Sequence, residues 1–397
     1  MIQAVSQVKL QTSVSFRALQ KLLITLQLQV ALITTTPTAP TLMNWIKKIG
    51  YYELTKEKEK SDDWIILLDH SIQLGREKVF VVLGIQADKI EYGRALNYAD
   101  LEPMLLVIKE KWDGQAICNY LTTLQERIGN IIYAIGDYGS DIKKGLELAG
   151  VPHVRDLTHE LASIIEKLYK KDPDYVSLTK KMGEIRMKLG QTESAYAMPP
   201  NQRQKSRFLN IGPISTWARD ILNAVETGKI QTLGKRMREQ VEWIESKKAF
   251  IEELSVINTV KSKIEKLLKT QGLNEKTIEN CIQFSSGLIG EKGKIFAGEI
   301  SKYLKSTFSL SKKERMICSS DILESAFGKY KNYLSKNPMA CVTDLVLCIP
   351  AFTCKLTEEN IKEALETVKI KQLQKWKQDN ICKTLLSKRK ELFKKVA

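Results

Sequence analysis

The chain has 397 residues, which is too long for one ordinary hydrophobic core and fits two or three domains. Its apolar content of 43% and charged content of 27% are those of a globular protein. The 62 Lys and Arg residues outnumber the 46 Asp and Glu residues, giving a net charge of +16. Such a charge favours an anionic partner: nucleic acid first, an anionic membrane surface second. The plain alternative is a soluble protein with spare surface lysines.

Two classes of protein are disfavoured by what the sequence lacks. No run of about 18 uncharged apolar residues exists, so we expect no membrane-spanning helix. The first residues do not have the charged start, apolar core and small-residue cleavage site of an export signal. The seven cysteines form no C-x-x-C pair and the three histidines have no zinc-ligand spacing, so we expect reduced thiols and a cytoplasmic protein.

Residues 1–60 are predicted to form a small helical unit. Ser13 or Ser15 can cap a first helix, and residues 34–41 have the composition of a loop. Thr41 can cap a second helix, which we expect Gly50 to end. Helix, loop and basic helix is typical of a helix-turn-helix DNA-binding region, although two plain packing helices have the same pattern. The candidate DNA contacts of this second helix, with both lysines expected to face outward, are Trp45, Lys47 and Lys48.

Residues 61–157 change to the pattern of an α/β domain. Short apolar runs bounded by turn residues predict strands over 64–68, 79–85, 104–108, 130–136 and 151–155. Amphipathic helices are expected over 117–128, between the third and fourth strands, and from Ser140 or Asp141 to Ala149, between the fourth and fifth. The order β-β-β-α-β-α-β is that of a ribonuclease H-like domain. We therefore predict an α/β fold with a mixed sheet of that kind.

Two of the predicted strands stop at an aspartate. The first ends at Asp69 and the fourth at Asp137. Carboxylates at the ends of neighbouring buried strands lie at the edge of a sheet where ligands bind. At 4 Å and an effective dielectric constant of 20 they repel by about 4 kcal/mol, and a divalent cation turns that repulsion into binding. Each could instead be an ordinary turn residue, and Asp141 is an alternative to Asp137, although it reads better as a helix N-cap.

The rest of the chain is predicted to be mostly helical. Residues 158–305 contain repeated amphipathic segments and read as a large helical insertion. A basic break in it carries three candidate DNA contacts, Arg203, Lys205 and Arg207. Residues 306–350 are expected to return to the core, and residues 351–397 form a basic helical tail whose apolar positions could pack or mediate self-association.

A second candidate site lies on a helix that Ser319 or Ser320 can cap. Helical spacing places Asp321, Glu324, Gly328 and Lys331 on one face. The small Gly328 would let that face approach another backbone or a nucleic-acid strand. Glu324 is the leading acid, with Asp321 and Glu314 as alternatives, and each could be a solvated helix carboxylate.

These residues make the chain resemble the DDE transposases of bacterial insertion sequences. The matching stretches are 64–84 with Asp69, 136–139 with Asp137, and 322–325 with Glu324. One group of these enzymes has a Tyr-x2-Arg-x3-Glu-x6-Lys motif. Glu324 and Lys331 match its second half, whereas position 317 is Ile and position 320 is Ser.

The resemblance implies a function and a set of roles. By this resemblance, the catalytic residues of the chain would be Asp69, Asp137 and Glu324. As in the family, they would hold two Mg²⁺ or Mn²⁺ ions for phosphodiester cleavage and strand transfer. Lys331 would contact DNA as a point charge, and Lys329 is a further candidate contact. The implied partners are double-stranded DNA at the element ends and target, and further copies of the chain in a dimer or larger assembly. The implied location is the nucleoid.

Two other functions remain open at the level of sequence. A metal-dependent nuclease or resolvase with the same core would need the same acids. A transposase-derived DNA-binding protein could keep the fold without the chemistry. The amino-terminal unit and the long insertion favour transposition.

Overall fold

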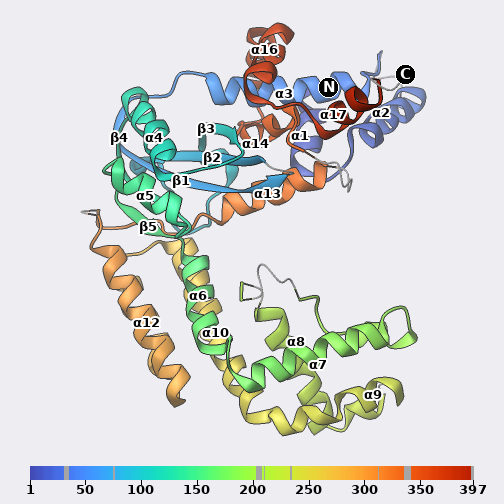
Figure 1. Cartoon of the computed structure of the whole chain (residues 1–397), viewed down its shortest axis with the longest axis vertical. Coiled ribbons are helices and arrows are strands. Elements are labelled where there is room, and N and C mark those ends of the chain that lie inside the picture. The colour runs from blue at the N-terminus through green and yellow to red at the C-terminus, as the bar shows by residue number, and fades with distance from the viewer. Residues whose placement is uncertain are drawn as a thin grey trace. The chain divides into compact units, whose positions relative to one another are not determined.

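The computed structural model describes residues 1–30, 35–74, 77–202, 208–209, 211–232, 235–311, 313–334 and 341–394 (Figure 1). The chain forms two compact units. The first consists of Met1–Glu91, Ala95–Val154 and Ser319–Ala397. The second consists of Tyr92–Arg94 and Arg155–Cys318. None of the described helices is both long enough and apolar enough to cross a membrane.

The first unit is built on a five-stranded mixed sheet with the spatial order β3-β2-β1-β4-β5. Its strands are β1 (Ser61–Leu74), β2 (Glu77–Gln86), β3 (Glu102–Lys109), β4 (Gly129–Gly136) and β5 (His153–Arg155). β2 is antiparallel to β1 and β3, whereas β4 is parallel to β1. Helix α4 (Gly114–Ile128) follows β3 and α5 (Ser140–Leu148) follows β4. The predicted order β-β-β-α-β-α-β is therefore confirmed.

The first strand is longer than predicted. Trp64 through Leu68 are each at most 1% exposed, as expected for a strand covered on both faces. The prediction that the strand stops at Asp69 is wrong, because β1 continues to Leu74. Its pairing with β2 shifts register between Asp69 and Ile72. Such a bulge bends a strand and re-aims the neighbouring side chains, so Asp69 lies at an irregularity within a strand rather than at its end.

One face of the sheet is covered by α4 and α5. Trp64, Ile66 and Leu68 belong to a buried cluster that also contains Leu121 of α4 and Leu146 of α5. These three positions alternate along β1, as side chains on one face of a strand must. The residues between them, Ile65 and Leu67, are just as buried but lie outside this cluster. They therefore belong to the opposite face.

The amino-terminal helices pack with carboxyl-terminal helices in the same unit. The amino-terminal helices are α1 (Ile2–Gln11), α2 (Phe16–Val30) and α3 (Ala39–Thr55). The carboxyl-terminal helices are α13 (Asp321–Tyr333), α14 (Cys348–Ala351), α15 (Glu358–Thr367), α16 (Ile370–Asn380) and α17 (Leu385–Lys394). Among them, α3 contacts α2, α14, α15, α16 and the edge strand β3.

Helix α3 differs from the prediction at both ends. Its N-cap is Thr38, whose side chain accepts a hydrogen bond from the backbone N–H of Thr41. Gly50 does not end the helix, which continues to Thr55. A Cβ at position 50 would lie 1.7 Å from the carbonyl oxygen of Leu347. The glycine is needed because another segment of backbone packs directly against this turn of the helix, a contact that the local sequence does not reveal.

The second unit is helical, as its amphipathic segments predict. Its α-helices are α6 (Leu157–Tyr169), α7 (Pro173–Leu189), α8 (Ile211–Glu226), α9 (Lys235–Val241), α10 (Lys248–Gln271), α11 (Glu275–Ser286) and α12 (Gly290–Phe308). Asp156 caps α6 by accepting a hydrogen bond from the backbone N–H of His159 at 2.9 Å. A short antiparallel bridge joins Leu273 to Met316.

Candidate active site at the sheet and helix α13

The two predicted catalytic aspartates follow equivalent positions of neighbouring parallel strands. Leu67 of β1 is paired with Ile135 of β4. Asp69 lies two residues beyond Leu67, and Asp137 lies two residues beyond Ile135. Neighbouring strands are about 4.8 Å apart, so this register brings the two backbone positions close together at one edge of the sheet.

Side-chain alternation also gives the two aspartates a common face. Asp69 has the same parity along β1 as Ile65 and Leu67, so it lies on the face opposite α4 and α5. Ile135 pairs with Leu67 and therefore shares its face of the sheet. Asp137 lies two residues after Ile135, so continued alternation past Gly136 places Asp137 on that same face. The two carboxylates are therefore expected on the face of the sheet that α4 and α5 leave uncovered.

Local hydrogen bonds hold each aspartate. Oδ1 of Asp69 accepts from the backbone N–H of His70 at 2.6 Å, and Oδ1 of Asp137 accepts from the backbone N–H of Gly139 at 3.1 Å. A Cβ at position 139 would lie 3.1 Å from Oδ1 of Asp137 and 3.0 Å from Oδ1 of Asp141. A side chain there would press on both carboxylates, which explains the glycine between them.

The alternative acid, Asp141, has a partner on the other face. Oδ2 of Asp141 lies 2.5 Å from Nε2 of His70, whose ring packs near Phe80 and Trp112 on the side of α4 and α5. Burial alone would raise the pKa of Asp141, but the hydrogen bond and charge of His70 outweigh it and lower the pKa. Asp141 lies in the first turn of α5 rather than at its N-cap, which is Gly139.

His70 was not predicted to have a role. The signal that could have found it is its place next to Asp69 on a buried strand, because neighbouring strand residues point to opposite faces. If Asp69 lies on one face of the sheet, His70 lies on the other face, under the helices. A buried polar side chain there needs a hydrogen-bond partner.

Helix α13 carries the predicted glutamate on its exposed side. Leu323, Phe327 and Tyr330 are at most 2% exposed and form its buried side. Glu324, Gly328 and Lys331 are exposed, so the predicted shared face is confirmed for these three residues, with Asp321 half-buried in the first turn. The helix packs against β1. None of its residues belongs to the buried cluster under α4 and α5.

Helix α13 begins where the sequence predicts, at Ser319 and Ser320. Ser320 is the N-cap but forms no side-chain capping bond. Instead, Oγ of Ser319 accepts a hydrogen bond from the backbone N–H of Asp321 at 3.4 Å. One turn farther on, the hydroxyl of Tyr98 donates to Oγ of Ser325 at 2.7 Å, which ties the residue next to Glu324 to the segment that precedes β3.

The two lysines of α13 have different surroundings. Lys331 is exposed on the side of Glu324. Lys329 is half-buried, with its ammonium 4.4 Å from the ring centre of Tyr98 and 5.3 Å from that of Phe352. Burial lowers the pKa of Lys329. Lys331 therefore remains the better candidate for a DNA contact.

The lysines of α3 do not face outward as predicted. Lys47 is buried, and its ammonium pairs with Oδ2 of Asp344 at 2.8 Å. Lys48 donates to the backbone carbonyl of Leu365 at 2.9 Å. Trp45 is half-buried. The outward orientation was inferred from α3 alone, and it is wrong because carboxyl-terminal helices cover this side of α3.

We predict that Lys47 stabilises the fold. Replacing Lys47 with Ala should lower the free energy of unfolding by about 1–3 kcal/mol, because it leaves the partly buried carboxylate of Asp344 without its closest cation. Urea denaturation would measure this, with exposed Lys60→Ala as the control, and a double-mutant cycle with Asp344→Ala should show coupling. Unchanged stability together with weaker DNA binding would instead support Lys47 as a DNA contact.

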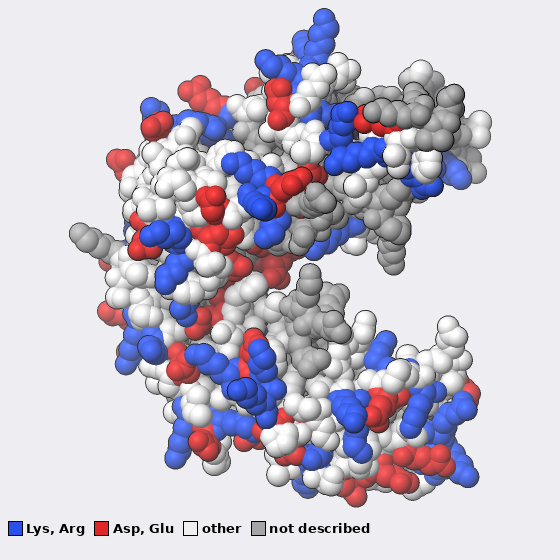
Figure 2. Space-filling model, viewed as in Figure 1, with Lys and Arg blue, Asp and Glu red and all other residues white. Residues whose placement is uncertain are grey.

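The predicted basic contacts of the insertion, Arg203, Lys205 and Arg207, lie outside the described residues. On the face drawn in Figure 2, Lys and Arg side chains are interspersed with Asp and Glu over both units. They do not merge there into one continuous basic surface. The net charge therefore does not by itself indicate where an anionic partner would bind on this face.

The three predicted acids have the donor chemistry that a divalent cation prefers, although their described positions do not bring them together. Carboxylate oxygens are preferred ligands of Mg²⁺ and Mn²⁺. Asp69, Asp137 and Glu324 supply them from two paired strands and a helix packed against one of those strands. Among the described residues, no three His, Cys, Asp or Glu side chains lie close enough together to hold a metal ion. Binding would thus require the three side chains to converge from the positions described.

The fold and site define a mixed α/β protein with a five-stranded mixed sheet and many helices. No family model matches the chain, and no curated protein matches it by sequence. One solved structure to which it is similar is described as the Drosophila P element transposase strand transfer complex. The identity is 10% and the TM-score 0.41, over 91% of this chain and 93% of that one. A TM-score of this size lies below the range that defines a shared fold.

Proposed function

We propose that this protein is a DNA transposase of the DDE type with a ribonuclease H-like core, as the sequence resemblance to the transposases of bacterial insertion sequences implies. The observation that supports it best is the register of β1 and β4. It gives Asp69 and Asp137 equivalent positions on neighbouring strands, and the helix that bears Glu324 contacts β1. The observed element order also supports a core of this kind.

Each residue has a proposed task in the reaction. Asp69, Asp137 and Glu324 would hold two Mg²⁺ or Mn²⁺ ions, which when bound supply an activated nucleophile and stabilise the leaving oxygen of a phosphodiester. The bulge after Asp69 and the bond from Gly139 to Asp137 orient the strand acids. The ammonium of Lys331 would attract a DNA phosphate alongside Glu324. Double-stranded DNA would be the substrate, and a dimer or larger assembly would bring two element ends together.

The test first searches the DNA that flanks the gene for inverted repeats and then assays DNA that carries any such repeats with Mg²⁺ or Mn²⁺. The proposal expects metal-dependent strand cleavage followed by joining of the freed 3′ end to a target. Cleavage without joining would instead identify a nuclease or resolvase. Binding to the repeats without cleavage in either metal would identify an inactive DNA-binding relative.

Gly328 gives a separate prediction. Nothing described lies within 4 Å of a Cβ built there, so the fold of the chain does not require a glycine inside α13. Gly328→Ala should raise the free energy of unfolding by about 0.8–1.0 kcal/mol. If DNA approaches this face, Gly328→Leu should slow cleavage by about 5- to 160-fold, because overpacking a contact costs about 1–3 kcal/mol.

Gly298 in α12 is the matched control, since it is also helical with nothing described within 4 Å of its Cβ. Gly298→Ala and Gly298→Leu should leave cleavage unchanged, and thermal unfolding would check stability. Wild-type cleavage by Gly328→Leu would contradict a close approach of DNA to this face.

A further inference from the structure

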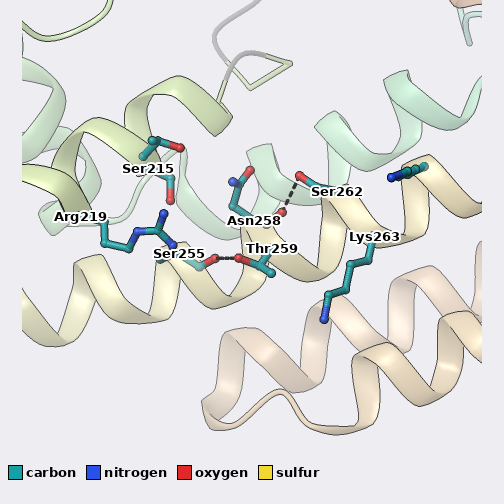
Figure 3. A pocket seen from close by; sticks show the side chains of 9 residues that line it. Ser215, Arg219, Ser255, Asn258, Thr259, Ser262 and Lys263 are labelled. Atoms are coloured by element: carbon teal, nitrogen blue, oxygen red, sulfur yellow. Dashed lines mark hydrogen bonds between the residues drawn. The ribbon is translucent and has the colours of Figure 1, made fainter.

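A polar pocket of about 310 Å³ lies between α8 and α10 of the second unit (Figure 3). Three of its lining residues are cations: Arg219, Lys263 and Lys266. The other six carry a hydroxyl or an amide, among them Ser215 and Ser255. No acidic or apolar side chain is among its lining residues. We call it the α8–α10 pocket.

Helical spacing explains how this lining arises. Ser255, Ser262 and Lys266 recur along α10 at intervals that keep them on one side of the helix. Ser215 and Arg219 are four residues apart on α8, which packs against α10. Nη1 of Arg219 donates to Oγ of Ser255 at 3.4 Å, and Figure 3 shows the guanidinium between the Ser215 and Ser255 side chains. The packing of two helices thus sets hydroxyl groups around a cation.

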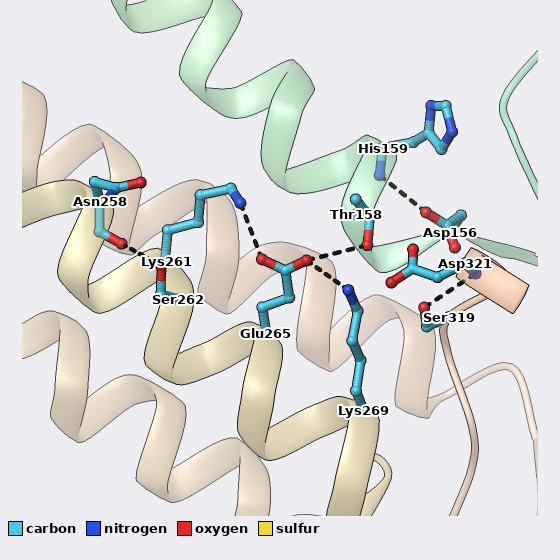
Figure 4. A network of polar contacts seen from close by, with 10 residues as sticks. All are labelled: Asp156, Thr158, His159, Asn258, Lys261, Ser262, Glu265, Lys269, Ser319 and Asp321. Carbon is cyan, nitrogen blue, oxygen red and sulfur yellow. Dashed lines mark hydrogen bonds and ion pairs between the residues drawn. The ribbon is translucent and has the colours of Figure 1, made fainter. Parts of the chain in front are cut away.

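The cations of the pocket differ from other lysines of α10. Lys261 and Lys269 both bond to the carboxylate of Glu265, at 2.9 and 2.5 Å (Figure 4). Burial alone would raise the pKa of Glu265, but these two lysines outweigh it and lower the pKa. By contrast, Arg219, Lys263 and Lys266 form no ion pair with any residue in the described part of the chain. The ammonium of Lys263 lies 6.0 Å from the ring centre of Phe284 on α11, a contact that leaves its charge in place.

A second pocket of the same unit provides a comparison. It has a volume of about 430 Å³ and is lined by both signs of charge, with Lys235 and Arg238 beside Glu239, Glu242 and Glu245. Its carboxylates would repel an anion. Of these two pockets, only the α8–α10 pocket has cations in its lining and no carboxylate.

We propose that the α8–α10 pocket binds phosphate groups of the DNA backbone. Lys, Arg, Ser, Thr and Asn side chains are the groups that commonly contact DNA phosphates, and such contacts fix position without reading sequence. The pocket would therefore add a contact with the DNA backbone that does not depend on sequence. The choice of DNA as the source of the phosphates rests on the proposed function, whereas the preference for phosphate rests on the pocket itself.

The experiment measures binding of duplex DNA to the full chain between 50 and 200 mM salt, in EDTA so that no cleavage contributes. The variant is Arg219→Ala/Lys263→Ala/Lys266→Ala. Each lost phosphate contact lowers the slope of log K against log salt by about 0.9, so the slope should fall by about 2.7. The control is Lys294→Ala/Lys302→Ala/Lys305→Ala, which removes the same charge from exposed positions of α12 and should keep the wild-type slope.

Three further measurements make each result interpretable. Thermal unfolding shows that both triple variants fold, and Lys263→Arg/Lys266→Arg should keep the wild-type slope because arginine also pairs with phosphate. Titration with ATP and with pyrophosphate tests soluble phosphates as the ligand.

An unchanged slope of log K against log salt in the pocket variant would overturn the proposal. An equal decrease of that slope in the α12 control would also overturn it, because it would indicate a general effect of net charge. Binding of ATP that only the pocket variant loses, with DNA binding intact, would overturn DNA as the ligand. These outcomes are independent of catalysis. Wild-type cleavage by Asp69→Ala would refute the proposed active site and leave the pocket untouched.

Discussion

Replacing Glu324 with Ala should reduce metal-dependent DNA cleavage at least about a thousandfold, a loss of about 4 kcal/mol of transition-state stabilisation, because one metal ligand is removed. The fold should be unaffected, since Glu324 lies on the exposed side of α13. Single-turnover cleavage of labelled DNA would measure the rate, and DNA binding in EDTA should stay within about twofold of the wild type, well under 1 kcal/mol.

The matched control is Asp321→Ala on the same helix, three residues earlier. Its carboxylate is the alternative acid, and the account expects cleavage within about threefold of wild type, less than 1 kcal/mol. If Asp321→Ala abolishes cleavage and Glu324→Ala does not, the acid of α13 has been assigned to the wrong residue. If neither change matters, α13 is not part of the active site.

The second large effect is expected at the strands. Asp69→Ala and Asp137→Ala should each lower cleavage at least about a thousandfold, because each removes a proposed ligand from neighbouring positions of the sheet. Mg²⁺ or Mn²⁺ titration of the residual activity should show weaker dependence on the metal.

Each strand variant has its own control. Asp62→Ala removes an exposed carboxylate from the same strand as Asp69. Asp141→Asn keeps an oxygen for His70 while removing the charge of the acid that competes with Asp137. Both should cleave at nearly the wild-type rate. Loss of activity in Asp141→Asn with normal activity in Asp137→Ala would transfer the role to Asp141.

The strands could be predicted because their information is local. The runs at 64–68 and 131–135 are apolar at every position, as expected for strands covered on both faces. The exposed face of α13 could be predicted for the same reason, since spacing along one helix fixes which residues share a side.

The errors came from contacts between distant segments. The partner of Lys47 is Asp344, which lies 297 residues later in the chain. The sequence around α3 therefore does not indicate this contact. Gly50 looked like a helix end because the segment that requires it, at Leu347, is equally remote. The predicted domain boundaries, metal ions and assembly remain predictions.

The α8–α10 pocket could not be predicted either. Ser255, Ser262 and Lys266 read as an ordinary solvated stripe of α10. Their significance depends on α8 packing alongside with Ser215 and Arg219, which is a tertiary contact. Helix patterns show which side chains share a face but not which second helix faces them.

Anomalous diffraction from crystals of the protein with Mn²⁺ and cleaved DNA would examine the sheet most directly. The account predicts ion peaks whose ligands include the carboxylates of both strand aspartates and of the α13 glutamate. Peaks held by other residues, or fully occupied DNA with no ion at these carboxylates, would contradict it.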